Sequence, residues 1–428
     1  MEILSAKWVV PMVGEPIMAG AVAIEGDEIV DVGFEMDLID RYPHAEVKDY
    51  TDHVIMPGLI NCHTHLDMSN YQNFENDPVR KIGGGAVNYI DWLIGCLTYK
   101  MNIDGGQVRE SVAWGIDQCL QSGTTCVADM GNYEGIFSLL EQKGLRAVVF
   151  PEVISCDSSV SKDMFESAMA IVEKYHESSE SELVSVGMGP YSSFMLSRNI
   201  LRILSQYCRS SQLPLMMHVS NSFSEMEFFN DSTGDVAEKL FPVVGWDDLP
   251  PSHHKTPIQH LLNLGFFDCR PILVGCTQAT PSDLAIIAQT GSKIVITPRS
   301  GLFLQQGQPD LQAIFDNHII TALGTDGMPS VDSLSLWDEM RALLQNYQQM
   351  NLTGHQILSM ATKHAAIVLG LDSEIGTLEP GKRADLIVVE ASGVSENGDF
   401  LLDLISQVKD YHVREVRVGG RVVKTVNG

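Results

Sequence analysis

The chain has 428 residues and a formal net charge of −27 at pH 7. This acidity disfavours nucleic acids and anionic membranes as partners, because both carry negative charge themselves. No apolar run reaches the length of about 18 residues that a membrane span needs, and the first residues lack the basic and apolar regions of a secretion signal. Eight scattered cysteines without a C-x-x-C pair favour reduced thiols over a disulfide framework. We therefore expect a cytoplasmic, globular protein.

Both ends of the chain have the texture of short strands joined by turns. Residues 1–53 contain the apolar runs EILSAKWVV, AVAIEG and EIVDVG, and the last part contains ADLIVVE and HVREVRVGGRVV. The first set alone is too small to bury a core. We predict that residues 1–53 and 371–428 combine in one small β-sandwich.

Between the two ends, strand-like and helix-like segments alternate. After the apolar run at 54–60 come TTCVADM, RAVVFPEV, LVSVGMGP, PLMMHVS, PILVGC, KIVITP and IITALGTD, and helix-like segments lie between most of them. Strands that alternate with helices form parallel sheets, and eight such units indicate a closed barrel. The prediction is an α/β fold with a (β/α)8 TIM barrel over residues 54–370. Two long connections, 67–105 and 221–256, follow the first and fifth strands at the mouth of this barrel.

Two histidines stand at the end of the first barrel strand. His63 and His65 are two residues apart, so on an extended segment their side chains point to the same side. Neutral imidazoles suit zinc, iron and related divalent ions. The alternative is a pair of surface or capping histidines.

Two more candidate ligands stand at the ends of later strands. His218 ends the fifth strand and Asp326 ends the eighth, and all strand ends of a barrel converge on one mouth. Each has a structural alternative, a core histidine and a helix cap respectively. Together, His63, His65, His218 and Asp326 predict a site for one divalent metal ion, with zinc favoured and iron as the other candidate.

Several segments resemble the amidohydrolase superfamily over nearly the whole chain. The most specific are PGLINCHTHLDMS and GTLEPGKRADLIVV, and SGTTCVADM, TALGTDG and SLSLWDEMRALL match in order. The branch most similar comprises adenosylhomocysteine and methylthioadenosine deaminases, guanine deaminases and triazine chlorohydrolases. The resemblance implies that the three histidines and Asp326 bind the metal. It also implies that Asp326 is catalytic, accepting a proton from the metal-activated water.

The sequence departs from this branch at positions that face the same cavity. Asn221 replaces a glutamate that shuttles protons in the family, and an amide does not titrate. Gly275 replaces a histidine that polarises the attacked centre, and Gln278 replaces a later histidine. Tyr191 stands where the fourth strand carries a histidine, and Gly301 where the seventh carries an asparagine.

We predict a substrate-binding set at these strand ends: Tyr191, Asn221, Gln278 and Arg299. Arg299 suits an anionic substrate group, with a structural ion pair as the alternative.

The long connection after the fifth strand contains four further titratable residues. We interpret Glu225, Glu227, His253 and His254 as solvated loop residues, and the alternative is that one of them replaces the missing proton shuttle.

These observations predict an enzyme, a metal-dependent hydrolase acting on a non-peptide carbon–nitrogen bond of a small, cyclic substrate. The altered shuttle shifts weight toward a leaving group that needs no protonation, such as a halide. The rival hypothesis is a catalytically degenerate member that binds a metal or ligand without deaminating. The expected partner is a small molecule, and a homodimer is one possible assembly.

Overall fold

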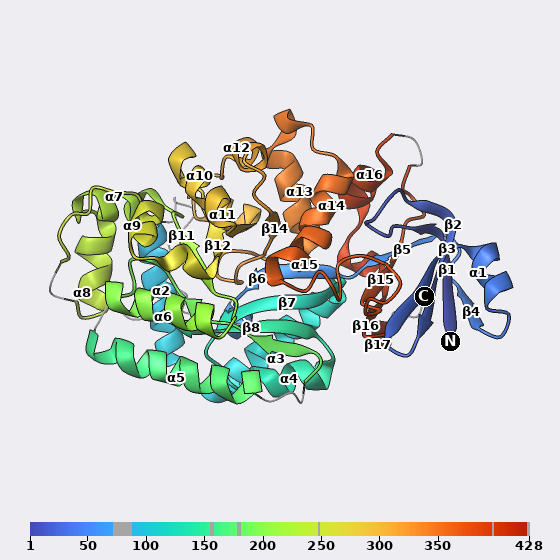
Figure 1. The fold of residues 1–428 in the computed structure, drawn as a ribbon, viewed down its shortest axis with the longest axis horizontal. Coiled ribbons are helices and arrows are strands. Elements are labelled where there is room, and N and C mark those ends of the chain that lie inside the picture. Colours follow the sequence, from blue (N-terminus) through green and yellow to red (C-terminus); the bar gives the residue numbers. More distant parts are fainter. Residues whose placement is uncertain (72–87, 155–157, 178–180, 247–248, 396–397, 426–428) are drawn as a thin grey trace.

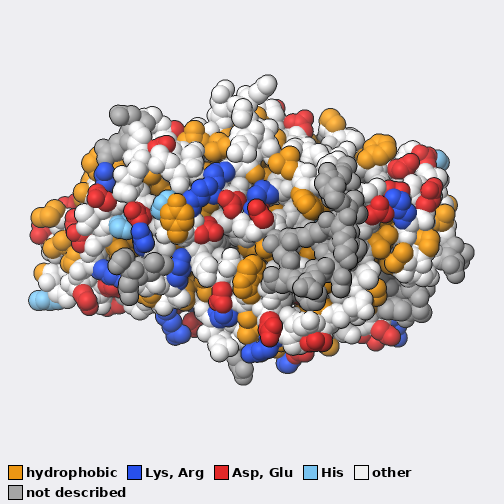
Figure 2. Space-filling view, turned by 180° about the vertical axis from the view of Figure 1, so that it is seen from behind, with side chains coloured by type: hydrophobic (Ala, Val, Ile, Leu, Met, Phe, Trp, Pro, Cys, Tyr) orange, Lys and Arg blue, Asp and Glu red, His pale blue; other side chains and the backbone are white. Residues whose placement is uncertain are grey.

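The computed structural model describes residues 1–71, 88–154, 158–177, 181–246, 249–395 and 398–425. Strands from both ends of the chain form a sheet at one end of the molecule, and parallel strands surrounded by helices make up the rest (Figure 1). Within the described ranges, no helix is both long and apolar enough to cross a membrane. On the face shown in Figure 2, acidic side chains are scattered among lysines and arginines rather than gathered in one patch.

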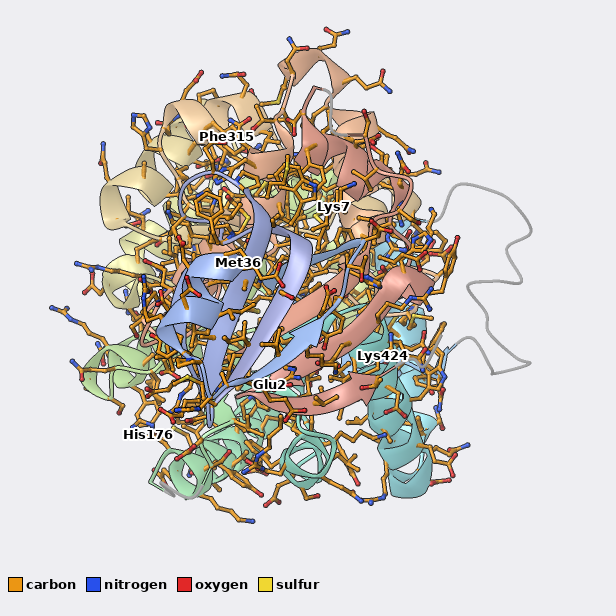
Figure 3. All side chains as sticks on the ribbon, turned by 90° about the vertical axis from the view of Figure 1, so that its right-hand side faces the viewer. Glu2, Lys7, Met36, His176, Phe315 and Lys424 are labelled. Carbon is orange, nitrogen blue, oxygen red and sulfur yellow. The ribbon has the colours of Figure 1, made fainter. Side chains whose placement is uncertain are left out.

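The terminal sheet has eight strands from the two ends of the chain. They are β1 (Glu2–Val9), β2 (Ile17–Glu25), β3 (Glu28–Phe34), β4 (Glu46–Asp49), β5 (His53–Pro57), β15 (Leu386–Glu390), β16 (Val413–Val418) and β17 (Arg421–Thr425). Their order is β17-β16-β15-β5-β1-β2-β3, and β4 pairs with β1. In Figure 3, Glu2 on β1 and Lys424 on β17 lie at the same end of the molecule. Pairing of the two ends is therefore observed as one sheet, in which β5 joins the N-terminal to the C-terminal strands.

The remaining strands form two parallel sheets. The first contains β6 (Leu59–Thr64), β7 (Thr124–Gly131), β8 (Arg146–Val153), β9 (Val184–Val186) and β10 (Gly189–Pro190), and the second contains β11 (Met216–Val219), β12 (Ile272–Gly275), β13 (Lys293–Ile296) and β14 (Thr321–Leu323). Isolated bridges link their edges: Thr64 with Asp326, Met188 with Leu215, and Ser192 with His218. The fold is a mixed α/β arrangement in which two parallel sheets meet through single bridges, and the described residues form no continuous ladder around a closed barrel.

Helices separate most of these strands, as expected. They are α1 (Glu35–Arg41), α2 (Tyr89–Asn102), α3 (Gly105–Gln121), α4 (Ile136–Lys143), α5 (Ser158–Glu177), α6 (Arg198–Ser210), α7 (Phe223–Asp231), α8 (Phe241–Val243), α9 (Pro257–Asn263), α10 (Pro281–Thr290), α11 (Pro298–Phe303), α12 (Leu311–Asp316), α13 (Leu336–Asn346), α14 (Gly354–Met360), α15 (Lys363–Leu369) and α16 (Phe400–Gln407).

The ends of α10 show how the local sequence sets these boundaries. The Thr280 side chain accepts from the Asp283 backbone N–H, Pro281 occupies the first turn, and Gly291 ends the helix at φ +70°.

The apolar run predicted as one strand at 54–60 is two strands. β5 pairs with β1 and β15 in the terminal sheet, whereas β6 pairs with β7. The chain crosses between sheets at Gly58, where a Cβ would lie 2.0 Å from Thr125 Oγ1. Proline followed by a glycine in such a close approach explains the break. Residues 54–57 therefore belong to the terminal sheet, and β6 carries His63.

Alternate residues of the parallel strands face two different cores. Val274 and Val295 join an apolar cluster on one face of the sheets, while their neighbours Leu273 and Ile294 join the cluster that packs under helices such as α10. Strands buried on both faces read as continuous apolar runs, which is the pattern found in the sequence. The histidines His63 and His218 lie toward the carboxyl ends of β6 and β11.

Candidate metal-binding active site

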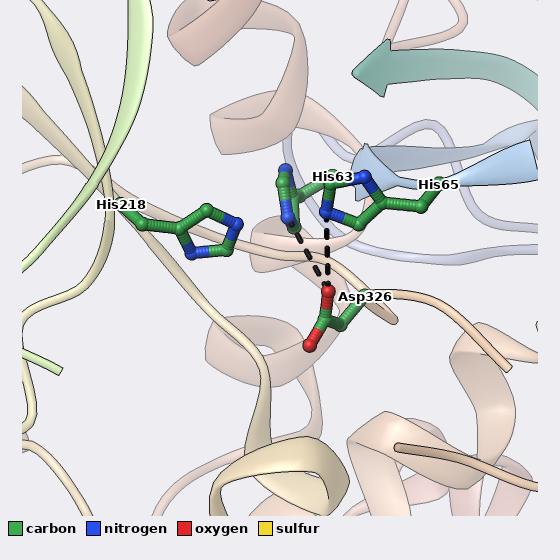
Figure 4. A group of neighbouring side chains, drawn as sticks. All are labelled: His63, His65, His218 and Asp326. Carbon is green, nitrogen blue, oxygen red and sulfur yellow. Dashed lines mark ion pairs between the residues drawn. The ribbon is translucent and has the colours of Figure 1, made fainter. Parts of the chain in front are cut away.

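Three histidines and one aspartate converge at the carboxyl ends of β6, β11 and β14 (Figure 4). One ligand atom from each of His63, His65, His218 and Asp326 lies within 4.8 Å of the others, and all four residues are buried. Nε2 of His63 and Nε2 of His65 are each 3.5 Å from Asp326 Oδ1. We call these four residues the ligand cluster. The structure thus brings together the four residues predicted to bind a metal.

Close backbone approaches place Asp326 against β6. A Cβ at Gly324 would lie 2.7 Å from His63 Cβ, and one at Gly327 would lie 3.2 Å from His65 Cβ. Asp326 itself has a φ of +64°, a conformation that costs free energy in a non-glycine residue and is found mainly at functional sites. The glycines on either side of Asp326 therefore let its carboxylate reach both histidines.

Neighbouring groups fix the orientation of the cluster. His65 Nδ1 lies 2.8 Å from the Met130 carbonyl oxygen and donates to it, which leaves Nε2 free as a ligand. Asp326 Oδ2 accepts hydrogen bonds from Ser300 Oγ at 2.6 Å and from Ser330 Oγ at 3.0 Å. Sequence reasoning missed these supporting residues. Ser300 lies between Arg299 and Gly301, two positions singled out in the sequence, but Ser330 carries no signal of its own.

The protonation states of the cluster fit a divalent cation. Burial, helped by the proximity of His63, lowers the pKa of His218 to about 3 and that of His65 well below 6.5. Burial alone would raise the pKa of Asp326, but the nearby imidazoles of His63 and His65 hold this pKa well below its usual range. At neutral pH His65 and His218 are therefore neutral imidazoles and Asp326 is a carboxylate, the forms in which these groups bind metals.

Unpartnered nitrogens and their spacing fit the same cation. Nε2 of His63 and Nε2 of His218 are buried without a hydrogen-bond partner, which is rare for buried polar atoms. Ligand atoms around a tetrahedral zinc ion stand roughly 3.4 Å apart, close to the 3.5 Å separations measured here. The donor set and its geometry therefore fit one metal ion.

Asn221 and Gly275 occupy a single space beside His218. Asn221 Nδ2 lies 3.1 Å from His218 Nδ1, and Asn221 Oδ1 accepts from the Cys276 backbone N–H at 3.2 Å. A Cβ at Gly275 would lie only 1.7 Å from Asn221 Oδ1. The two sharpest departures from the family are thus in direct contact, and the amide fills the place of a side chain at position 275.

The other predicted substrate-binding residues lie in different settings. Tyr191 is buried with its ring centroid 5.2 Å from that of His218, and burial raises the pKa of Tyr191 well above 10, so the phenol stays neutral. Gln278 Nε2 donates to the Gln306 carbonyl oxygen at 2.6 Å.

Arg299 Nε donates to Glu339 Oε1 at 2.7 Å, and Nη1 donates to Asp332 Oδ1 at 2.8 Å. For Arg299 the structure supports the ion-pair alternative rather than contact with an anionic substrate.

Glu225 is not the solvated loop residue that we expected. It is 1% exposed, its Oε1 accepts from Ser193 Oγ and its Oε2 accepts from the Asn221 backbone N–H, both at 2.9 Å. Burial raises the pKa of Glu225 to about 7. Asn221 lies in the turn between β11 and α7, so the hydrogen bond from its backbone N–H to the Glu225 carboxylate stabilises this turn. His253 packs instead against the ring of His260, away from the ligand cluster.

A mainly apolar cavity adjoins the ligand cluster. His65, Tyr191 and Asp326 line one side, and Trp92, Leu93 and Cys96 of α2 line the other. Part of the connection at 67–105 lies outside the described residues, but its helix α2 covers the site as expected for a segment at the mouth. The cavity and the ligand cluster together form a candidate active site for a small, largely apolar molecule.

Comparisons with known proteins agree with this geometry. The model of the amidohydrolase family matches residues 54–423. The chain is 27% identical over 417 residues to a 5-methylthioadenosine/S-adenosylhomocysteine deaminase of Caldanaerobacter subterraneus subsp. tengcongensis, which covers 94% of this chain and 88% of that protein.

Two solved structures share the fold. An adenosine deaminase from Xanthomonas campestris with bound zinc has a TM-score of 0.82 at 23% identity, covering 98% of this chain and 92% of the other. An atrazine chlorohydrolase from Arthrobacter aurescens TC1 complexed with zinc has a TM-score of 0.82 at 20% identity, covering 99% and 95%.

Proposed function

Because the chain belongs to the amidohydrolase family, we propose that it is a metal-dependent hydrolase that cleaves a non-peptide carbon–nitrogen bond of a small, cyclic substrate. The observation that carries this proposal is the ligand cluster, with two buried Nε2 atoms that find no hydrogen-bond partner among the described residues. The named relatives include deaminases of nucleosides. The comparisons give no support to a catalytically degenerate member.

We propose zinc as the metal, with iron as the alternative, because a set of three imidazoles and one carboxylate suits either ion. A bound divalent ion would supply an acidified water and would polarise the attacked centre. His63, His65, His218 and Asp326 would hold it. The zinc in neighbouring structures supports the first choice.

Separate residues of this chain accept the proton, bind the substrate and orient the metal ligands. The Asp326 carboxylate is the proton acceptor closest to the metal-binding position, and Ser300 and Ser330 hold its second oxygen. Tyr191 and the apolar residues of α2 bind the substrate and exclude water. Asn221 orients His218 and cannot deliver a proton to a leaving amine.

The nature of position 221 favours a second candidate reaction. A departing halide needs no proton, whereas an amine does, and general acid help is worth roughly 10²–10⁴-fold in rate. We propose that halogenated heterocycles are alternative substrates, and we expect weak deamination of adenosine-type and guanine-type compounds. Similarity to an atrazine chlorohydrolase fold is consistent with this choice.

The test combines metal analysis with a substrate screen. Purified protein is assayed for bound metals and then incubated with aminated and halogenated heterocycles while ammonia and halide release are recorded. We expect about one divalent ion per chain and turnover that disappears in the Asp326→Asn variant. A protein that binds no divalent metal under any loading condition would overturn the proposal.

We further propose that the parallel strands from β6 to β14 close into a (β/α)8 barrel within residues 58–370, and that residues 1–57, which include β5, form a β-sandwich with residues 371–428. The bridges between Thr64 and Asp326 and between Ser192 and His218 support closure, since they join the edges of the two parallel sheets. An experimental structure with metal bound tests this division through the hydrogen bonds at those edges.

A further inference from the structure

The cavity beside the ligand cluster contains few polar groups, and nearly all have partners within the protein. The Trp92 indole N–H donates to the Pro329 carbonyl oxygen at 3.3 Å. Tyr191 is buried beside Tyr89 and His218. Lys100 Nζ contacts carboxylate oxygens at 3.0 and 3.2 Å. These groups shape the cavity but have little hydrogen-bonding capacity left for a ligand.

Glu152 is the exception. It lies at the end of β8, is 2% exposed and lines the cavity. Its Oε2 accepts from Lys100 Nζ at 3.0 Å, but its Oε1 is buried without a hydrogen-bond partner. Among the described residues that line this cavity, Glu152 has the one side-chain oxygen or nitrogen identified as both buried and unpartnered. A buried carboxylate oxygen without a partner is costly in free energy, so a ligand that donates to it gains accordingly.

The residues around Glu152 fix the position of its side chain and determine whether it favours a hydrogen-bond donor or an anion as a ligand. Its backbone N–H donates to Asn132 Oδ1 at 2.8 Å, which anchors the end of β8. Lys100 is shared between Glu152 and Asp67, so one ammonium faces two carboxylates. The local excess of negative charge favours a hydrogen-bond donor and disfavours an anion.

We infer that Glu152 Oε1 accepts a hydrogen bond from an N–H or O–H group of the substrate. Glu152 is then a specificity-determining residue, and the cavity selects a flat, apolar ring that carries a donor over a ring of the same shape without one. The inference rests on the proposed function, because it takes the cavity beside the ligand cluster as the substrate site. A site built to bind such a donor rejects the analogue that lacks it.

Indole and 1-benzofuran provide a matched pair of probes. They have nearly the same shape, but only indole has an N–H donor, and neither carries an amine or halide that the enzyme could release. Dissociation constants for the metal-loaded protein are measured by isothermal titration calorimetry. We expect indole to bind at least about tenfold more tightly than benzofuran, the ratio given by one hydrogen bond to a charged acceptor.

Two variants test whether the preference for indole over benzofuran depends on Glu152. Glu152→Gln keeps the size of the side chain but replaces one carboxylate oxygen with a donor, so the ratio should fall to within about twofold. Glu415→Gln serves as the control, because Glu415 is equally buried, at 1% exposed, and lies on β16 of the terminal sheet. The control should keep the wild-type ratio.

Each outcome decides the inference. Equal affinity of the wild-type protein for the two rings, or binding of neither, overturns it even if Glu152→Gln fails to fold. A preference for indole that survives in folded Glu152→Gln assigns the acceptor elsewhere and also overturns it. Because both probes are inert, the result does not depend on turnover. Failure of the proposed function would appear separately, as absence of metal and of hydrolysis in the screen.

Discussion

Replacing Gly275 with alanine tests whether Asn221 and Gly275 act as one unit. Gly275 has a φ of +96°, and its Cβ would lie 1.7 Å from Asn221 Oδ1 and 2.4 Å from Asn221 Cγ. The left-handed backbone costs an alanine about 1–2 kcal/mol, and forcing an extra methyl into a packed site costs about 1–3 kcal/mol. Gly275→Ala should therefore lower the free energy of unfolding by roughly 2–5 kcal/mol.

A variant of Asn221 separates the steric cost of Gly275→Ala from its backbone cost. Asn221→Ala removes one of the two acceptors of the Cys276 backbone N–H, which still donates to the Val219 carbonyl oxygen at 3.1 Å, so the lost hydrogen bond costs about 0.5–1.5 kcal/mol. The same change clears the space that a Cβ at position 275 needs. The double variant should then be less destabilised than the sum of the single variants by about 1–3 kcal/mol, the steric part of the cost.

Urea unfolding of the metal-loaded proteins measures all four free energies. Gly291→Ala is the matched control for backbone strain, since Gly291 has a φ of +70° and a Cβ there would lie 4.0 Å from Arg270 Cδ, which is ordinary van der Waals contact. It should lose only the left-handed cost of about 1–2 kcal/mol. Free energies of the Asn221 and Gly275 variants that add to within about 0.5 kcal/mol would refute the idea that the two positions share one space.

Three further variants test the site and the fold. Asp326→Asn should reduce turnover of the best substrate at least about 100-fold, because it removes the proposed proton acceptor, and unchanged turnover would show that water activation runs elsewhere. Burial raises the pKa of Glu225 from 4.5 to about 7, so the folded state holds this proton more tightly than the unfolded state. The resulting stabilisation is complete below pH 4.5 and is lost as pH rises through about 7. Urea unfolding between pH 5 and 8 should show that Glu225→Gln lacks this loss, of roughly 3 kcal/mol, and parallel pH profiles would contradict the assignment. Deleting residues 413–425 removes β16 and β17 and exposes an edge of β15, so we expect insoluble protein, whereas a soluble, monomeric product would show that the strands are dispensable.

The ligand cluster could be predicted from the sequence because its members stand at strand ends. A histidine pair spaced by two residues fixes its own geometry, and parallel strands deliver His218 and Asp326 to the same edge without any knowledge of packing. The pairing of the two chain ends followed from strand-like texture that neither end could bury alone.

What the sequence did not reveal depends on contacts between distant segments. The break at Gly58 arises from the approach of Thr125, a contact that no local pattern encodes. Glu225 lies in a polar stretch of the long connection, and only the fold shows that Ser193 and a backbone N–H bury it. Arg299 finds Glu339 on a helix that begins after the next strand. Periodicity predicts which face of an element is buried, but not which partner a buried charge finds there.

The place of β5 in the terminal sheet has a consequence for how the protein is made. Leu386 pairs with Pro57, so one neighbour of β5 is synthesised long after β5 itself. β6, which carries His63, begins two residues after β5 ends. While the chain is still emerging from the ribosome, β5, which leads directly into β6, pairs with β1 but lacks β15, and the long loop to β15 has yet to close. Metal capture is therefore expected only after β15 has been synthesised, and nascent fragments that end before β15 should carry none.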